Sequence, residues 1–243
     1  MPRPLTGLHI ITGLRILAAA LLAGAPFSAH ADDGTAPDGA PGAGANGPAE
    51  SPENELRLYV SGGLAIPSDP PEFSDLWDTG PAFGGAVGIR VSPFWEVVAS
   101  VDYQRFPTDE QAQADDLLLA GFGDTFFIDS IEGREVTVVT VMASARFHVP
   151  TDDPAWSPYL GFGWGLFEVF TSDAQITAGN GTIGPITLVG DTDTAFGVQV
   201  GGGIQWAVAP GAFVVLDLVY TVGFTELIST QYLPVRLGLG FSL

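Results

Sequence analysis

Seven charged side chains lie within otherwise apolar segments, and they are the groups in this sequence best placed to interact chemically. Each segment alternates between apolar residues and polar or small ones, so the charges of one segment lie on one face. A charge among apolar neighbours needs a partner, and carboxylates and guanidinium groups suit each other. The pattern therefore predicts a set of ion pairs. The seven residues are Arg57, Arg90, Glu96, Asp102, Arg146, Asp217 and Arg236.

The sequence permits one of these pairs to be placed by its spacing. Arg90 and Glu96 flank a short turn, and residues opposed in an antiparallel pair of strands share a face. A three-residue turn pairs Val91 with Trp95 and sets Arg90 across from Glu96. A two-residue turn would pair Arg90 with Val97 and mix the faces. We predict the three-residue turn and an Arg90–Glu96 ion pair; the alternative is a solvated set of side chains.

A second group of possible ligands is acidic and lies in three long connections, residues 67–80, 107–133 and 171–192. None of them contains Lys or Arg. Clustered carboxylates can bind divalent cations such as Ca²⁺ or Mg²⁺. We favour a solvated acidic surface and keep cation binding as the alternative. The acids are Asp69, Glu72, Asp75, Asp78, Asp109, Glu110, Asp115, Asp116, Asp124, Asp129, Glu132, Asp173 and Asp191.

Residues for covalent or acid–base catalysis are scarce. The chain has no cysteine, and His148 is the only histidine beyond residue 31. It ends an alternating segment, so we interpret it as a strand-end residue and not as a general base. We predict neither an enzyme nor a bound cofactor or metal.

The elements that hold these residues are eight alternating segments, each about the 9–11 residues or more that a membrane-crossing strand needs. Long and short connections between them alternate, as in a barrel with both ends of the chain on one side. We therefore predict an all-β fold, an eight-stranded antiparallel transmembrane up-and-down β-barrel with short turns in the periplasm. The segments are Leu56–Ile66, Pro81–Val91, Trp95–Phe106, Arg134–His148, Pro158–Phe170, Asp193–Ala207, Ala212–Phe224 and Tyr232–Leu243.

Aromatic residues collect at the segment ends, which predicts two interfacial bands of rings. The short-turn band contains Phe94, Trp95, Trp156, Tyr159, Trp206 and Phe213, and the other contains Tyr103, Phe106, Phe170, Phe196, Tyr220, Phe224 and Tyr232. Apolar residues also occur in the second long connection, at 117–122 and 126–128. We expect them to fold over the barrel mouth; a partner site or contact with lipid are the alternatives. Pro234 conflicts with the last strand, so we expect pairing there to begin after it.

The N-terminal part reads as a leader. Residues 1–31 combine two arginines, a short apolar run and Ala29-His30-Ala31, which predicts a secretory signal peptide. Residues 32–54 are rich in Gly, Ala, Pro and acids, which predicts a disordered periplasmic leader. The barrel occupies residues 55–243. Beyond residue 31 there are six arginines, no lysine and 28 acids, a formal charge of −22 that excludes nucleic acid as a partner.

The last residues carry a family resemblance. In Val235–Leu243 the apolar face holds Leu237, Leu239, Phe241 and Leu243. This stretch resembles the C-terminal assembly signal of bacterial outer-membrane barrels, although the family's usual last residue is aromatic. The segment Pro158–Gly165 (PYLGFGWG) resembles the fifth strand of small eight-stranded outer-membrane barrels, the OmpA membrane domain and the opacity-type proteins.

The resemblance implies a multi-pass protein of the bacterial outer membrane that contacts lipid, lipopolysaccharide and the barrel-assembly machinery. Some such barrels modify lipopolysaccharide with a histidine near the outer face, but His148 is predicted at the opposite end. We expect a non-enzymatic structural or cell-surface interaction role. The alternative is a narrow channel or carrier for small hydrophobic molecules. Inward charges argue for a closed lumen, and inward glycines leave room for larger neighbours.

Overall fold

The computed structural model describes residues 55–109, 112, 128–153, 155–178, 186–225 and 229–243. These residues belong to one compact unit, Gly47–Leu243. The expected signal peptide and leader lie outside the described residues, as do the apolar residues 117–122 and most of 126–128.

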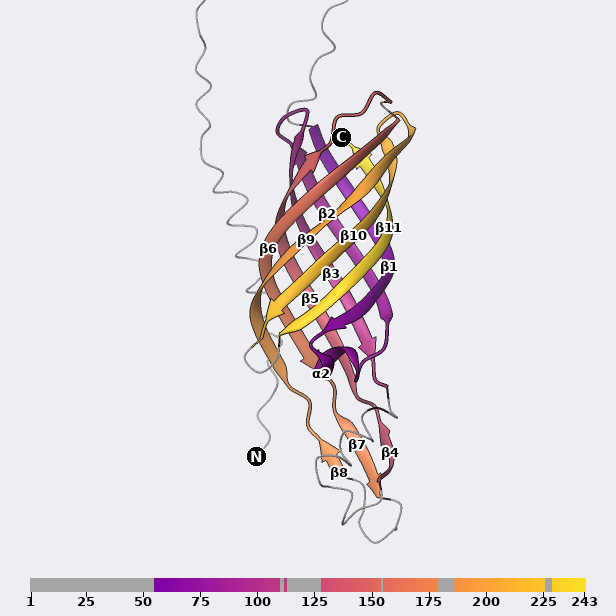
Figure 1. The fold of residues 1–243 in the computed structure, drawn as a ribbon, viewed down its shortest axis with the longest axis vertical. Coiled ribbons are helices and arrows are strands. Elements are labelled where there is room, and N and C mark those ends of the chain that lie inside the picture. Colours follow the sequence, from indigo (N-terminus) through magenta and orange to yellow (C-terminus); the bar gives the residue numbers. More distant parts are fainter. Residues whose placement is uncertain (1–54, 110–111, 113–127, 154, 179–185, 226–228) are drawn as a thin grey trace, which may run out of the picture. The chain divides into compact units, whose positions relative to one another are not determined.

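Eight long strands form a closed antiparallel barrel in the order β1-β11-β10-β9-β6-β5-β3-β2 (Figure 1). The fold prediction is confirmed, since each strand contains or closely matches one of the eight alternating segments. The strands are β1 (Glu55–Asp69), β2 (Gly80–Arg90), β3 (Trp95–Pro107), β5 (Glu135–His148), β6 (Trp156–Thr171), β9 (Thr192–Ala209), β10 (Ala212–Phe224) and β11 (Thr230–Ser242).

The two faces of the wall follow the alternation of the sequence. Outward side chains such as Leu58, Val60 and Phe83 are apolar and exposed, whereas their neighbours in sequence point into the barrel and are largely buried. A soluble protein would bury such a continuous apolar surface, and a lipid bilayer covers it instead. Within the described residues, no helix is long and apolar enough to cross a membrane.

Strand register agrees with the sequence at the first short turn and differs at the last strand. Arg90 pairs with Glu96, and the Val91 N–H donates to the Trp95 carbonyl over 2.9 Å, so the three-residue turn is confirmed. The expectation that pairing begins after Pro234 is wrong. Strand β11 starts at Thr230, and Pro234 pairs with Ala65 of β1. The ladder with β10 is interrupted beside the proline, so its missing N–H costs little there.

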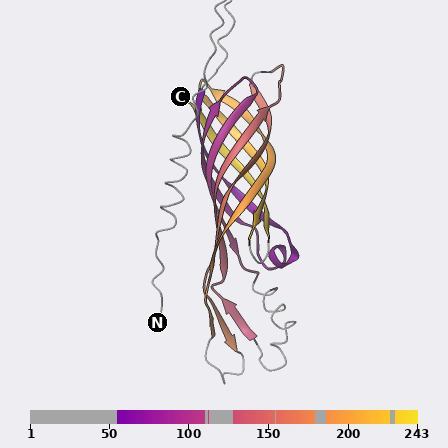
Figure 2. The same cartoon turned by 90° about the vertical axis from the view of Figure 1, so that its left-hand side faces the viewer.

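The long connections contain a second, small sheet that the sequence did not predict (Figure 2). Strands β4 (Ile128–Glu132), β7 (Ala174–Ala178) and β8 (Ile186–Leu188) pair antiparallel in the order β4-β7-β8. With five, five and three residues, these strands are too short for an alternating pattern to stand out.

The first long connection contains the single-turn helix α2 (Pro71–Ser74), which lies at the long-loop end of the barrel in both views (Figures 1 and 2). We call this end, with the connections after β1, β3, β6 and β10, the long-loop end. The other end, with the turns after β2, β5 and β9, is the short-turn end.

Candidate functional site

The barrel lumen holds all seven predicted charges, and it is divided into two unlike parts. Toward the long-loop end lies an apolar plug, and toward the short-turn end lies a polar network. The plug consists of Ala65, Phe73, Trp77, Ala82, Phe106, Val136, Val138, Met142, Phe167, Ala195 and Tyr232, all buried. The network consists of six of the seven charges, all but Arg90, with Glu55, Tyr59, His148, Ser157, Tyr159 and Gln205.

The plug is completed by residues that enter from the first long connection. The Phe73 ring meets the Phe106 ring edge-on, with 5.2 Å between centroids, and Phe106 in turn packs against Tyr232. Trp77 forms a β-bridge with Thr108, and the guanidinium of Arg134 lies 5.9 Å from the centre of its ring. The first connection therefore caps the barrel mouth. The expectation of a cap from 117–128 lies almost wholly outside the described residues.

The predicted aromatic bands need a correction, because four of their members are lumen residues. Phe106 and Tyr232 belong to the plug, and Tyr159 and Phe213 are buried near the short-turn end. Outward rings remain at that end, at Phe94, Trp95, Trp156 and Trp206. Position in the sequence marks the depth of a ring in the barrel, but only the alternation says which face it occupies.

Glu96 is the centre of the network near the short-turn end. Its carboxylate is fully buried and accepts hydrogen bonds from the Tyr59 hydroxyl and, at 3.1 Å, from Nε2 of His148. The second ring nitrogen, Nδ1 of His148, lies 2.9 Å from Oγ of Ser157. A Cβ atom on Gly88 would lie 2.2 Å from the Glu96 carboxylate, so glycine is required there.

Two sequence interpretations fail at this point. The Arg90–Glu96 ion pair is wrong, although the two residues are opposed in the ladder: Nη2 of Arg90 donates instead to the Pro93 carbonyl at 2.7 Å. Both oxygens of Glu96 already have partners, Tyr59 on the non-adjacent strand β1 and His148 on the adjacent strand β5. His148 is at the end of β5, as expected, but it is a buried member of the network and not a plain strand-end residue.

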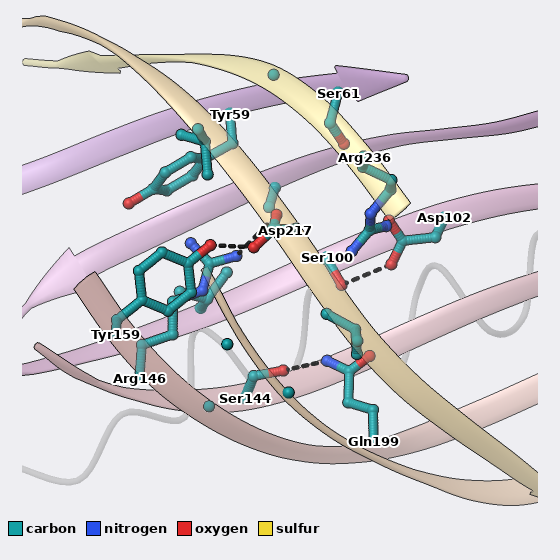
Figure 3. Close-up of a pocket in the computed structure, with 18 of the residues that line it drawn as sticks. Tyr59, Ser61, Ser100, Asp102, Ser144, Arg146, Tyr159, Gln199, Asp217 and Arg236 are labelled. Carbon is teal, nitrogen blue, oxygen red and sulfur yellow. Dashed lines mark hydrogen bonds and ion pairs between the residues drawn. The ribbon is translucent and has the colours of Figure 1, made fainter. Parts of the chain in front are cut away.

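Arg146 lies between two tyrosine rings near the middle of the lumen (Figure 3). Its guanidinium carbon is 4.9 Å from the ring centres of both Tyr59 and Tyr159, which are cation–π distances. Its Nη2 is 4.0 Å from the Asp217 carboxylate, which accepts a hydrogen bond from the Tyr159 hydroxyl. Tyr59 and Tyr159 were not among the predicted site residues, although both occupy inward positions of the alternation.

A second ion pair, Arg236 with Asp102, joins strands that are not neighbours (Figure 3). Arg236 is opposed to Asp217 in the β10–β11 ladder, yet its guanidinium reaches across the lumen to Asp102, which also accepts from the Ser100 hydroxyl at 3.0 Å. Gly84 leaves the space for the Asp102 carboxylate, since a Cβ there would lie 2.1 Å from it.

A small polar cavity of about 50 Å³ lies among these groups. It is lined by Asp102, Arg146, Asp217 and Arg236, and by the hydrogen-bonded pair Ser144 and Gln199. Nη1 of Arg146 and Nε of Arg236 have no hydrogen-bond partner in the part of the chain that the structure describes. Because about 10–15 Å³ suffices for one water, the cavity can hold a few waters that satisfy these donors.

The remaining predicted charge, Arg57, closes the network at the short-turn end. It forms an ion pair with Glu55 at 2.7 Å, donates to Gln205 at 3.1 Å and lies over the Phe213 ring. Six of the seven predicted charges are thus held in four groups, around Glu96, Asp217, Asp102 and Glu55. Arg90 belongs to none of them, since in the described residues it bonds only to the Pro93 carbonyl.

Hydrogen bonds and ion pairs join these groups, and three of them have an arrangement that also occurs in enzymes. Ser157, His148 and Glu96 follow one another in the order of the Ser-His-acid sites of hydrolases. In the part of the chain that the structure describes, no three carboxylate or histidine residues group as metal ligands. Glu110, Asp115, Asp116 and Asp124 of the acidic connections lie outside that part.

Comparison with known proteins agrees with this architecture. A family model described as the outer membrane protein beta-barrel domain matches residues 17–241. The chain is similar to the crystal structure of Neisserial surface protein A, with a TM-score of 0.51 and 16% identity over 77% of this chain and 97% of that one.

Two further solved structures are similar at lower scores. The N-terminal β-barrel domain of Pseudomonas aeruginosa OprF gives a TM-score of 0.43 and 13% identity, covering 80% of this chain and 100% of that one. Yersinia pestis Ail, in complex with the heparin analogue sucrose octasulfate, gives 0.44 and 15%, covering 79% and 99%. Among curated proteins, none matches the sequence.

Proposed function

The chain belongs to the outer membrane protein β-barrel domain family, and on that premise we propose that it is a non-enzymatic protein with a structural or cell-surface interaction role. It spans the bacterial outer membrane through its eight barrel strands and contacts the lipid there. The observation that carries the proposal is the filled lumen, in which an apolar plug and an ion-paired network lie one above the other.

The filled lumen argues against free passage of solutes. Ions would have to cross the plug, where the lining side chains are hydrocarbon and aromatic. Apolar molecules would have to cross the network, where Arg146 sits between two tyrosine rings and Arg236 is paired with Asp102. The plug therefore excludes ions, and the network excludes apolar molecules.

The alternative function, a narrow channel or carrier for small hydrophobic molecules, draws support from the apolar character of the plug. It requires the capping residues Phe73 and Trp77 to leave the barrel mouth. Conductance in planar bilayers and uptake of an apolar dye into liposomes test both functions. We expect neither current nor uptake with the purified protein; sustained uptake would favour the carrier.

We also propose that the long-loop end faces the cell exterior and the short turns face the periplasm. The acidic, long connections support this orientation, because barrels of this family have long outer loops and short periplasmic turns. An epitope tag in residues 107–133 should be cut by protease added to intact cells, whereas a tag at 92–94 should be protected. The reverse result would invert the orientation.

Partners follow from the same orientation. Lipopolysaccharide would surround the long-loop end, and divalent cations could bind its acidic connections. The exposed side chains of Leu237, Leu239, Phe241 and Leu243 would present the assembly signal to the barrel-assembly machinery. Truncating the last three residues should lower the amount of protein in the outer membrane.

The absence of catalysis is part of the proposal. A structural role accounts for Ser157, His148 and Glu96, because their contacts continue to Tyr59 and Gln205 and so join strands across the lumen. Glu96 and His148 are 0% and 2% exposed, as expected for parts of a packed network.

A further inference from the structure

A second cavity, of about 200 Å³, lies at the short-turn end between the turns after β2 and β5. Its lining includes Arg90, Phe94, His148, Thr151, Trp156 and Ser157. It is several times larger than the lumen cavity and therefore has room for more than a few waters. Arg90 is the only Arg or Lys in this lining.

Arg90 differs from the other arginines of the described residues in its lack of a charged or aromatic partner. Arg57, Arg105, Arg146 and Arg236 each lie within ion-pair distance of a carboxylate, and Arg134 lies over the Trp77 ring. Arg90 has one hydrogen bond, to the Pro93 carbonyl. Its Nε–H is buried with no partner in the described residues. That Nε–H is covered by protein atoms and is out of a ligand's reach. The guanidinium has other N–H donors, however, and no carboxylate of the described residues lies within ion-pair distance of them, which points to a ligand that binds there.

The two carboxylates opposed to Arg90 in its ladders are already engaged. Glu96 is held by Tyr59 and His148, and Glu55, which faces Arg90 in the β1–β2 ladder, is paired with Arg57. In the turn after β5, Asp153 accepts the Ala155 N–H at 2.8 Å. Within the described residues, no carboxylate lies within ion-pair distance of Arg90, and an anion from outside the chain suits its charge.

The position of the cavity identifies the class of anion. Phe94 and Trp156 line it and are 45% and 41% exposed, and the outward rings of Trp95 and Trp206 lie at the same end of the barrel. Such rings mark the depth of the lipid head groups. Phosphate is the anion at that depth, and the planar guanidinium group binds it through two N–H donors at once.

We propose that this cavity binds a phosphate group, with the Arg90 guanidinium as its ligand. The Ser157 and Thr151 hydroxyls line the cavity, but they donate to His148 and to backbone carbonyls of the turn after β5. The expected source is a glycerophospholipid head group in the leaflet at the short-turn end. That choice of source rests on the membrane orientation proposed above, whereas the phosphate site itself does not. The predicted Arg90–Glu96 ion pair does not form because Glu96 accepts from Tyr59 and His148. For the same reason, Arg90 is left to bind phosphate.

Native mass spectrometry of the protein in a non-ionic detergent tests the site, with phosphatidylglycerol or phosphatidylethanolamine added. We expect one tightly retained lipid, and Arg90→Gln should weaken its retention about tenfold or more, because a charge-assisted hydrogen bond to phosphate is lost. The matched control is Arg105→Gln, which removes an exposed arginine from the other end of the barrel and should leave retention unchanged.

A second arm distinguishes lipid from soluble phosphate. Inorganic phosphate is titrated against detergent-solubilised protein, and binding is followed by tryptophan fluorescence, with Trp156→Phe to identify the reporting ring. Saturable binding that Arg90→Gln removes would support a site for soluble phosphate even if no lipid is retained. Heat-dependent gel migration shows that each variant is folded, and Arg90→Met, which also removes the charge, replaces Arg90→Gln if the latter fails this check. Equal retention by the Arg90 and Arg105 variants, or no binding in either arm, would overturn the proposal.

Discussion

Both halves of the lumen fill a narrow barrel, one with apolar side chains and the other with charged and polar ones. The plug fills space with apolar side chains, and part of it is supplied by a connection, through Phe73 and Trp77. The network fills space with charges supplied by the strands alone, each of which needs its own partner. Dispersion and hydrophobic burial are non-directional, so the plug depends on volume. Hydrogen bonds and charges are directional, so the network depends on which group meets which.

The largest expected effect is therefore a near-isosteric change in the network. Asp102→Asn keeps the shape but leaves the buried Arg236 guanidinium without its counter-charge. We expect the free energy of unfolding to fall by about 3–5 kcal/mol, measured by urea titration of the barrel refolded in lipid vesicles.

Two variants accompany this test. Asp102→Asn combined with Arg236→Met should recover part of the loss, because no buried charge is then left alone. Glu135→Gln is the matched control: it breaks an ion pair with Arg105 at an exposed site and should cost only about 0–1 kcal/mol. Equal losses for Asp102→Asn and Glu135→Gln would mean that the network is solvated.

A smaller loss is expected from deleting volume in the plug. Phe106→Ala removes a ring that contacts both Phe73 and Tyr232, and we expect a loss of about 3 kcal/mol in the same urea titration. The value lies at the lower end for such changes because the capping residues can move into the space. A loss well above that of Asp102→Asn would reverse the ranking of the two halves.

A volume-conserving change in the plug should be tolerated, in contrast to the network. Met142→Leu keeps the apolar volume, so we expect the free energy of unfolding to change by less than about 1.5 kcal/mol. A loss of the size expected for Asp102→Asn would show that the plug, too, depends on one specific arrangement.

The contrast also explains what the sequence could predict. Period-two alternation predicts strands, their faces and the register of the turn between Val91 and Trp95, because these depend on neighbours along a ladder. It does not predict the partners of Arg236 or Glu96. The contacts of Arg236 with Asp102 and of Glu96 with Tyr59 cross the lumen between strands that are not adjacent, from β11 to β3 and from β3 to β1.

The plug was also missed at the sequence level, for a different physical reason. Phe73 and Trp77 lie in an acidic, proline-containing connection, where no periodicity marks them as buried. Likewise, the strands of the small sheet are too short to alternate visibly. His148 and Ser157, by contrast, occupy inward positions at strand ends, and their parity would have suggested that they take part in the network.

The smallest expected effect concerns the reactivity of Ser157. If the Ser157–His148–Glu96 chain is structural, a fluorophosphonate probe should label the folded protein no more than a Ser157→Ala variant, as read by mass spectrometry of the intact protein. Specific labelling of Ser157 would mean that the network contains an activated nucleophile and would end the non-enzymatic interpretation.

The cap at the barrel mouth has a consequence for the order of events during assembly. Phe73 and Trp77 are translated between the first two strands, yet the cluster in which they pack includes Phe106 of β3, Val136 of β5 and Tyr232 of β11. The cluster into which these two rings pack is complete only when the last strand has closed the barrel. Contacts between residues this distant in sequence form late. A labelled Trp77 should therefore become protected from a water-soluble quencher only after the strands have inserted and paired. Until the strands have paired, the long-loop end of the barrel is open, and Phe73 and Trp77 are exposed to solvent.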